Sequence, residues 1–144
     1  MTVMSYQDWF QSGHTRRDLR QALANGTLRK MRRGVLTDVP ASASPRARHL
    51  ARVRATADVL GSQTYFARFS AAAIHDLPLL NRRYGEVTVV RTGGGHGSIA
   101  ATIHARRATI DPGDVTVVDG LPVTTLARTV ADLIRELPFA EAVM

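Results

Sequence analysis

Residues 15–37 read TRRDLRQALANGTLRKMRRGVLT, and their pattern determines the fold that the sequence predicts. Thr15 and Asp18 have the spacing of a capping box, in which a hydroxyl and a carboxylate accept hydrogen bonds from backbone N–H groups at a helix start. Three apolar side chains follow at the i, i+3, i+4 spacing of a core-facing helix stripe, namely Leu19, Ala22 and Leu23. Asn25 and Gly26 tolerate the left-handed conformation that ends many helices. The first half of the segment therefore predicts a short amphipathic helix.

The second half predicts a small basic β-hairpin. Residues 28–31 and 35–37 favour two short strands, and Gly34 can adopt the positive φ that a tight connection needs. The hairpin directly follows the helix, so both elements belong to the same small fold.

A further helix is expected upstream, from Ser5 to Gln11. Ser5 and Asp8 repeat the capping-box spacing, and Gly13 is a typical helix-ending residue. Two short helices, a glycine turn and a basic hairpin have the order of a winged helix-turn-helix, whose second helix lies in the DNA major groove. Residues 1–40 are therefore expected to form such a DNA-binding domain.

The charge distribution supports a polyanion partner. The chain has 144 residues and a net charge of +7. Residues 1–54 hold 11 basic and three acidic residues, whereas residues 55–144 hold eight basic and nine acidic ones. A basic front end on a neutral body favours nucleic acid, with a clustered solubility charge as the alternative.

Packing the apolar stripe inward leaves the polar side chains of the predicted second helix outward. Arginine can pair bidentately with guanine and glutamine with adenine, and a helix start favours phosphate. The candidate groove-facing residues are Arg16, Arg17, Arg20 and Gln21. The hairpin adds candidate phosphate or minor-groove contacts at Arg29, Lys30, Arg32 and Arg33. Arg48 and Arg52, one helical turn apart, are candidates for DNA-backbone contact outside the groove, with a solvated surface as the alternative.

The small residues of segment 40–45 predict a linker, followed by a small mixed α/β domain at residues 46–144, so the fold class is α+β. A helix is expected from Pro45 to about Leu60, with a buried stripe at Leu50, Val53, Ala57 and Leu60. Further helices are expected near 70–76 and 126–136, the last capped by Thr125. Strands are expected near 63–67, 86–91, 99–105, 114–118 and 122–123.

Several kinds of site are not expected. The absence of cysteine excludes disulfides, thiol nucleophiles and cysteine-type zinc sites, and the five histidines lack metal-ligand spacing. The glycine-rich run 93–97 lacks the Gly-Lys-Ser/Thr ending of a phosphate loop and favours a hairpin tip between its flanking strands. His75 is expected to be packed or capping. No catalytic, metal-binding or cofactor-binding residue is predicted, so the protein is not expected to be an enzyme.

No apolar run approaches the roughly 18 residues that a membrane span needs, and the chain does not open with a signal peptide. A soluble, cytoplasmic protein without a membrane partner is therefore expected.

The chain also resembles a known family, the AbiEi-type antitoxins and transcriptional regulators of type IV toxin–antitoxin systems, in particular actinobacterial-like members. The matching stretches follow the family's order over almost the whole chain: TRRDL at 15–19 with Gly26, LRKMRRGV at 28–35, SAAAIH at 70–75 with Leu77-Pro78, DGLPVT at 119–124, and ARTVADL at 127–133.

The resemblance implies an N-terminal winged-helix domain that binds inverted repeats in its own promoter, and a C-terminal domain that counters a neighbouring toxin without a stable toxin complex. It implies no cofactor; a second protomer on the DNA follows if the site is symmetric. The chain departs from the family at Ala67-Arg68-Phe69, where Ser-His-Glu is usual. It stops at Met144, where relatives continue, so it resembles a truncated member.

Two other functions stay open. The second possibility is an enzyme, in which this chain would be the DNA-targeting N-terminal part of an endonuclease of the very-short-patch-repair type whose catalytic part is missing. The third possibility is a protein-interaction module that uses the region of Trp9 and Phe10 or the alanine-rich helix near residue 70.

Overall fold

Two β-sheets organise the described residues, 1–93 and 103–143, of the computed structural model, and the fold is α+β. The chain divides into two compact units, unit 1 from Met1 to Asp58 and unit 2 from Val59 to Met144. The sequence places the boundary earlier, in the linker 40–45. The helix that begins at Pro45 belongs to unit 1 instead, because it packs against two strands of the first sheet.

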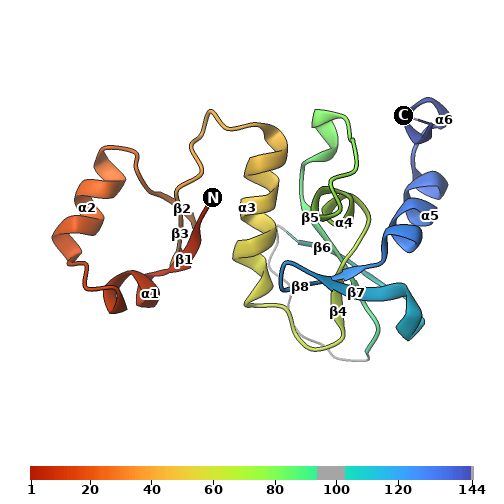
Figure 1. The fold of residues 1–144 in the computed structure, drawn as a ribbon, viewed down its shortest axis with the longest axis horizontal. Helices are drawn as coiled ribbons and strands as arrows, with labels where there is room; N and C mark the ends of the chain where they lie inside the picture. The colour runs from red at the N-terminus through yellow and green to blue at the C-terminus, as the bar shows by residue number, and fades with distance from the viewer. Residues whose placement is uncertain (94–102, 144) are drawn as a thin grey trace. The chain divides into compact units, whose positions relative to one another are not determined.

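Unit 1 places a three-stranded antiparallel sheet between a helix pair and a single helix (Figure 1). Its elements are β1 (Val3–Ser5), α1 (Tyr6–Gln11), α2 (Arg16–Ala24), β2 (Arg29–Arg32), β3 (Val35–Thr37) and α3 (Pro45–Ala57). The strand order is β1-β3-β2. The two helices and the hairpin match the predicted elements, whereas β1 is a strand that the sequence analysis missed.

Both predicted capping boxes are present. The Asp8 N–H donates to Ser5 Oγ at 3.0 Å and the Ser5 N–H donates to Asp8 Oδ2 at 2.9 Å. At α2 the Asp18 N–H donates to Thr15 Oγ1 at 3.2 Å and the Thr15 N–H donates to Asp18 Oδ2 at 2.7 Å. The hydroxyl and N–H of Ser5 both donate to the Asp8 carboxylate, and the N–H and hydroxyl of Thr15 both donate to the Asp18 carboxylate, which favours the ionised form and holds the pKa of both aspartates below its ordinary value.

The core of unit 1 fills the space between the helix pair and the sheet. Its buried members are Leu19, Ala22, Leu28 and Leu36, and the half-buried Met4, Tyr6, Trp9 and Leu23 pack against them. The predicted apolar stripe of α2 therefore does face the core. The stripe predicted for α3 is only partly right, because the helix buries His49, Ala51, Val53, Ala55 and Thr56, while Leu50, Ala57 and Leu60 stay half-exposed.

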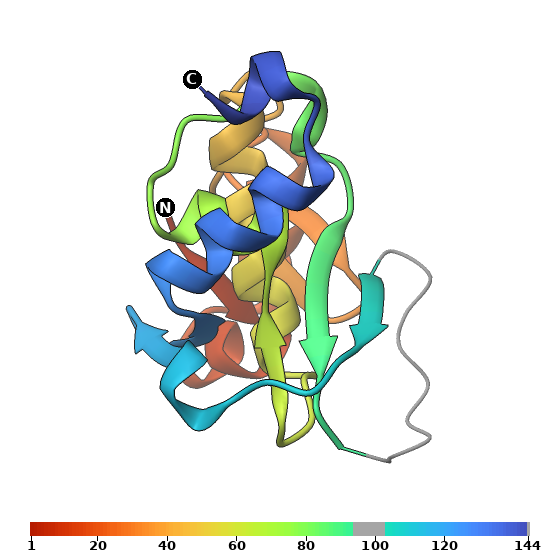
Figure 2. The same ribbon diagram turned by 90° about the vertical axis from the view of Figure 1, so that its right-hand side faces the viewer.

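Unit 2 contains a five-stranded mixed sheet with the order β6-β5-β4-β8-β7. Its elements are β4 (Thr64–Phe66), α4 (Arg68–Ile74), the 3₁₀ helix η1 (Asn81–Arg83), β5 (Val87–Arg91), β6 (Ile103–Arg107), η2 (Pro112–Asp114), β7 (Val115–Val118), β8 (Leu121–Thr124), α5 (Leu126–Glu136) and α6 (Phe139–Ala142). Helices α4 and α5 pack on each other, and α4 also packs on β5 (Figure 2).

The pairing of β5 with β6 corrects one prediction. The two strands run parallel, with Val87 beside Ile103 and Arg91 beside Arg107. A hairpin consists of antiparallel strands, so β5 and β6 do not form the predicted hairpin. Residues 94–97 of the glycine-rich segment between the two strands lie outside the described residues.

A tight turn does join β7 and β8, which pair antiparallel. Asp119 and Gly120 both adopt positive φ, at 49° and 77°, as the common two-residue hairpin turn requires. The Arg128 N–H then donates to Thr125 Oγ1 at 3.3 Å, so Thr125 caps α5 as predicted.

Within the described residues, no helix has the length and apolar character needed to cross a membrane.

Candidate nucleic-acid interface

Helix α2 separates its apolar and polar side chains cleanly. Leu19 and Ala22 are buried, whereas Arg17 and Gln21 are exposed on the opposite side of the helix. The capping box fixes where the helix begins and the core fixes its rotation. The outward row is therefore set by packing, as the sequence predicts.

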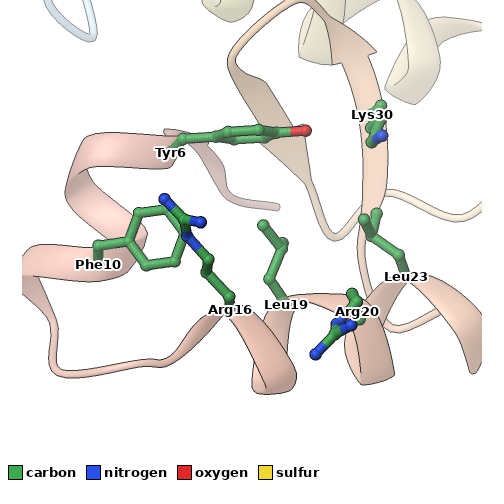
Figure 3. Close-up of a pocket in the computed structure, with 7 residues that line it drawn as sticks. All are labelled: Tyr6, Phe10, Arg16, Leu19, Arg20, Leu23 and Lys30. Carbon is green, nitrogen blue, oxygen red and sulfur yellow. The ribbon is translucent and has the colours of Figure 1, made fainter.

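Three cations lie beside this row around one hollow of about 610 Å³ (Figure 3). Arg16 and Arg20 come from α2 and Lys30 comes from β2. The rest of the hollow is apolar and aromatic, lined by Tyr6, Phe10, Leu19 and Leu23. Helix and hairpin thus contribute positive charge to one surface.

The cations of the hairpin strand β2 lie on both faces of the sheet. Lys30 pairs with Leu36 and so shares the face that packs against α1 and α2. The register shifts at Met31, so that Arg29 pairs with Thr37 and Arg32 pairs with Val35. Arg29 lies on the opposite face of the sheet from Lys30 by ordinary alternation, and the bulge puts Arg32 on that face as well.

Arg29 and Arg32 donate hydrogen bonds to backbone carbonyls on that opposite face. Arg29 Nη1 donates to the Val39 carbonyl at 3.2 Å, and Arg32 Nε donates to the Ala55 carbonyl at 2.8 Å. The Ala55 carbonyl belongs to the last turn of α3, where carbonyls lack partners within the helix. Two of the four hairpin residues predicted to contact DNA therefore anchor unit 1 internally, while Arg33 lies exposed in the hairpin turn.

The carboxylates of residues 1–54 are engaged elsewhere. Asp8 and Asp18 serve the capping boxes, and Asp38 accepts the Thr2 N–H at 2.6 Å. Within residues 1–93 and 103–143, the following cations have neither a hydrogen bond nor an ion pair: Arg16, Arg17, Arg20, Lys30 and Arg33. Uncompensated cations on one side of a unit attract a polyanion.

The start of α2 is less suited to phosphate than the sequence suggests. The capping box already uses the N–H groups of Thr15 and Asp18, and it places a carboxylate at this end of the helix. The guanidinium groups of α2, rather than its N-terminal amides, are thus the available anion contacts.

Arg48 and Arg52 lie exposed on α3, on the other side of the sheet from α2 (Figure 1). Partial burial lowers the pKa of Arg52, and the neighbouring Arg48 charge lowers it further. The two residues share one helix face, as expected from their spacing, but not the surface of the hollow.

The two regions considered for protein interaction were the one around Trp9 and the alanine-rich helix α4. Trp9 packs on the core and stacks on His14 with ring centroids 3.9 Å apart. Ala71, Ala72 and Ala73 are fully buried, so these alanines of α4 are not available for contact with a partner. His75 Nε2 lies 2.7 Å from the Thr124 carbonyl, to which it donates, so His75 is a packed residue as predicted.

The comparisons with known proteins do not assign this chain to a family. No protein-family model matches the sequence, and no characterised protein matches it either.

Proposed function

We propose that unit 1 binds duplex DNA, with α2 in the major groove, and that the protein is a sequence-specific transcriptional regulator. The observation that carries this proposal is the surface formed by Arg16, Arg20 and Lys30 beside the outward row of α2, three cations that form no hydrogen bond or ion pair within the described residues. The order strand, helix, four-residue connection, helix and hairpin is the order expected of a winged helix-turn-helix.

The surface divides into base-reading and phosphate-binding parts. Arg17 and Gln21 project furthest from the core, and Arg20 is one turn from Arg16 on the flank. Arginine and glutamine form bidentate contacts with guanine and adenine, so these three α2 residues read base edges. Lys30 and Arg33 of the hairpin bind phosphates and fix the register.

The biological role follows from the resemblance to AbiEi-type regulators. In that role the protein represses its own toxin–antitoxin operon by binding inverted repeats. Two protomers would occupy half-sites about 34–36 Å apart, one helical turn of DNA. No cofactor is needed, and no stable complex with the toxin forms.

The test is selection of binding sites from random duplex DNA with the full chain, followed by a search for the motif upstream of its own gene. Arg17→Ala is expected to weaken binding and broaden the motif, whereas the matched control Arg82→Gln, an exposed arginine of unit 2, leaves both unchanged. Failure to enrich any motif would refute the proposal. Co-purification with a protein partner at high salt, without a DNA shift, would favour an interaction module. Metal-dependent nicking would favour an endonuclease.

A further inference from the structure

A second concentration of arginines lies inside unit 2. A cavity of about 440 Å³, here called the arginine cavity, is lined by Arg68, Arg106, Arg107, Arg128 and Arg135. These residues come from α4, β6 and α5. Two carboxylates, Asp132 and Glu136, also line the cavity, so its walls carry a formal excess of three positive charges.

The carboxylates are committed to two of the arginines. Arg68 pairs with Glu136, and Arg128 Nε donates to Asp132 at 3.0 Å. Arg128 also reaches Asp114 at 3.1 Å, outside the cavity lining. These pairs neutralise both acidic groups of the wall and leave none for the arginines that remain.

The remaining arginines of the cavity are largely exposed to solvent. Arg106 and Arg107 are exposed on the edge strand β6, and across the described ranges 1–93 and 103–143 they have no hydrogen bond or ion pair. Arg135 approaches Asp132 only to 3.9 Å and its side chain is 77% exposed. Charged side chains converge here without a matching counter-charge.

Arg68 shows how close the like charges come. Its side chain is only 12% exposed, and both burial and the Arg106 charge lower the pKa of Arg68. Its backbone adopts φ +52°, a left-handed conformation uncommon for arginine. An anion in the cavity would relieve the repulsion between Arg68 and Arg106.

The residue types define the anion. The guanidinium group is a planar fork that matches phosphate oxygens bidentately, and several such groups around one space suit a multiply charged phosphate. The volume lies within the range of small-molecule sites, about 300–1,000 Å³. Val89 and Val90 add an apolar part to the lining.

We propose that the arginine cavity of unit 2 binds a phosphate group, held mainly by Arg106 together with Arg68 and Arg128, with Arg107 beside it at the end of β6. The same chemistry has two sources, a free phosphorylated molecule of nucleotide size and a phosphate of a DNA backbone. The site lies wholly within unit 2 and does not depend on DNA binding by unit 1.

The first arm of the test titrates the full chain with pyrophosphate and with adenosine triphosphate by calorimetry at constant ionic strength. Arg106→Gln/Arg107→Gln is expected to weaken binding at least tenfold. The variant Arg106→Lys/Arg107→Lys keeps the positive charge but loses the planar fork of the guanidinium group. Its affinity is expected to lie between those of the parent protein and the double glutamine variant. The control Arg82→Gln/Arg83→Gln removes two arginines of unit 2 outside the cavity and leaves the affinity unchanged. Circular dichroism checks that each variant is folded.

The second arm distinguishes the sources through the salt dependence of binding to the selected duplex. If the cavity holds DNA phosphates, the double glutamine variant lowers the slope by about 0.9 for each phosphate that it no longer neutralises. If the ligand is a free phosphorylated molecule, the slope stays and only pyrophosphate or nucleotide binding disappears. The proposal is overturned if the glutamine variant matches the parent protein in both arms. Arg17→Ala/Gln21→Ala separates the two proposals, because it abolishes site selection and leaves pyrophosphate binding intact.

Discussion

The two units differ less in how many basic residues they hold than in where their carboxylates go. Unit 1 has 11 basic and four acidic residues, and unit 2 has eight of each. In unit 1, Asp8 and Asp18 accept hydrogen bonds from helix-starting N–H groups rather than pairing with arginines. In unit 2, Asp132 and Glu136 pair with arginines around a cavity.

This comparison shows why net charge alone is a poor guide to an anion site. In the part of the chain that the structure describes, the cations of α2 form no ion pair because the nearby Asp18 carboxylate is held by hydrogen bonds at the helix start, although its charge still acts on Arg17. Unit 2 has no net charge, yet within the described residues Arg106 and Arg107 form no ion pair, because the two carboxylates of the cavity wall are held by other arginines. The placement of acidic partners decides which arginines can meet an external anion.

The largest expected effect comes from testing whether the units fold separately. Leu36 is fully buried in the core of unit 1, and Leu36→Ala is expected to cost about 2–5 kcal/mol of stability through reduced burial and a residual cavity. Hydrogen exchange should lose protection in unit 1 while unit 2 and its pyrophosphate binding persist. Leu126→Ala, at a leucine that is 49% exposed, is the matched control and should change stability little. Equal loss of protection in both units would show that they unfold together.

The next effect separates base reading from phosphate binding within unit 1. Arg20→Ala is expected to cost about 1–3 kcal/mol of binding free energy and to relax the preference at one base position. Lys30→Ala, across the same hollow, should weaken all duplexes alike and lower the salt slope by about 0.9. Titration of selected and scrambled duplexes at several salt concentrations measures both. Uniform weakening by Arg20→Ala would reassign Arg20 to phosphate.

A smaller effect tests the internal role of the second hairpin arginine. Arg32→Ala removes the hydrogen bond to the Ala55 carbonyl and is expected to lower stability by about 1.5 kcal/mol, the low end for bonds to charged groups. Arg33→Ala, at the exposed turn, should lower the salt slope of DNA binding and leave stability unchanged. Denaturant unfolding measures the change in stability of each variant, and duplex titration at several salt concentrations measures the change in salt slope. The reverse pattern would mean that Arg32 is the phosphate contact.

The features that could be predicted from the sequence are local ones. Thr15 with Asp18 and Thr125 before α5 act within one helical turn, and the sequence therefore places those helix starts correctly. The bulge at Met31 depends on pairing across a sheet. It moves Arg32 to the far face, which no alternation within the strand indicates.

The other features that the sequence analysis missed have the same physical origin. The parallel pairing of β5 and β6 and the membership of α3 in unit 1 depend on contacts between distant segments. The arginine cavity joins Arg68 to Arg106 and Arg135 across three elements, and no spacing in the sequence indicates it. The one available signal was the run Arg106-Arg107 at the end of a predicted strand.

The smallest expected effect tests the claim that capping consumes the acids of unit 1. Thr15→Ala removes the hydroxyl that accepts the Asp18 N–H, and it is expected to cost about 1 kcal/mol at neutral pH. The hydrogen bonds from Thr15 hold the pKa of Asp18 below its ordinary 3.8 in the folded state. The stability that this carboxylate contributes is therefore fully present above that value and is lost as pH falls through the lower folded pKa. Denaturant unfolding at successive pH values should show a constant difference between parent and variant above about pH 5, narrowing below it as Asp18 gains a proton. A difference that is independent of pH would mean that the hydrogen bond from the Thr15 hydroxyl to the Asp18 carboxylate contributes nothing to the stability of the helix start.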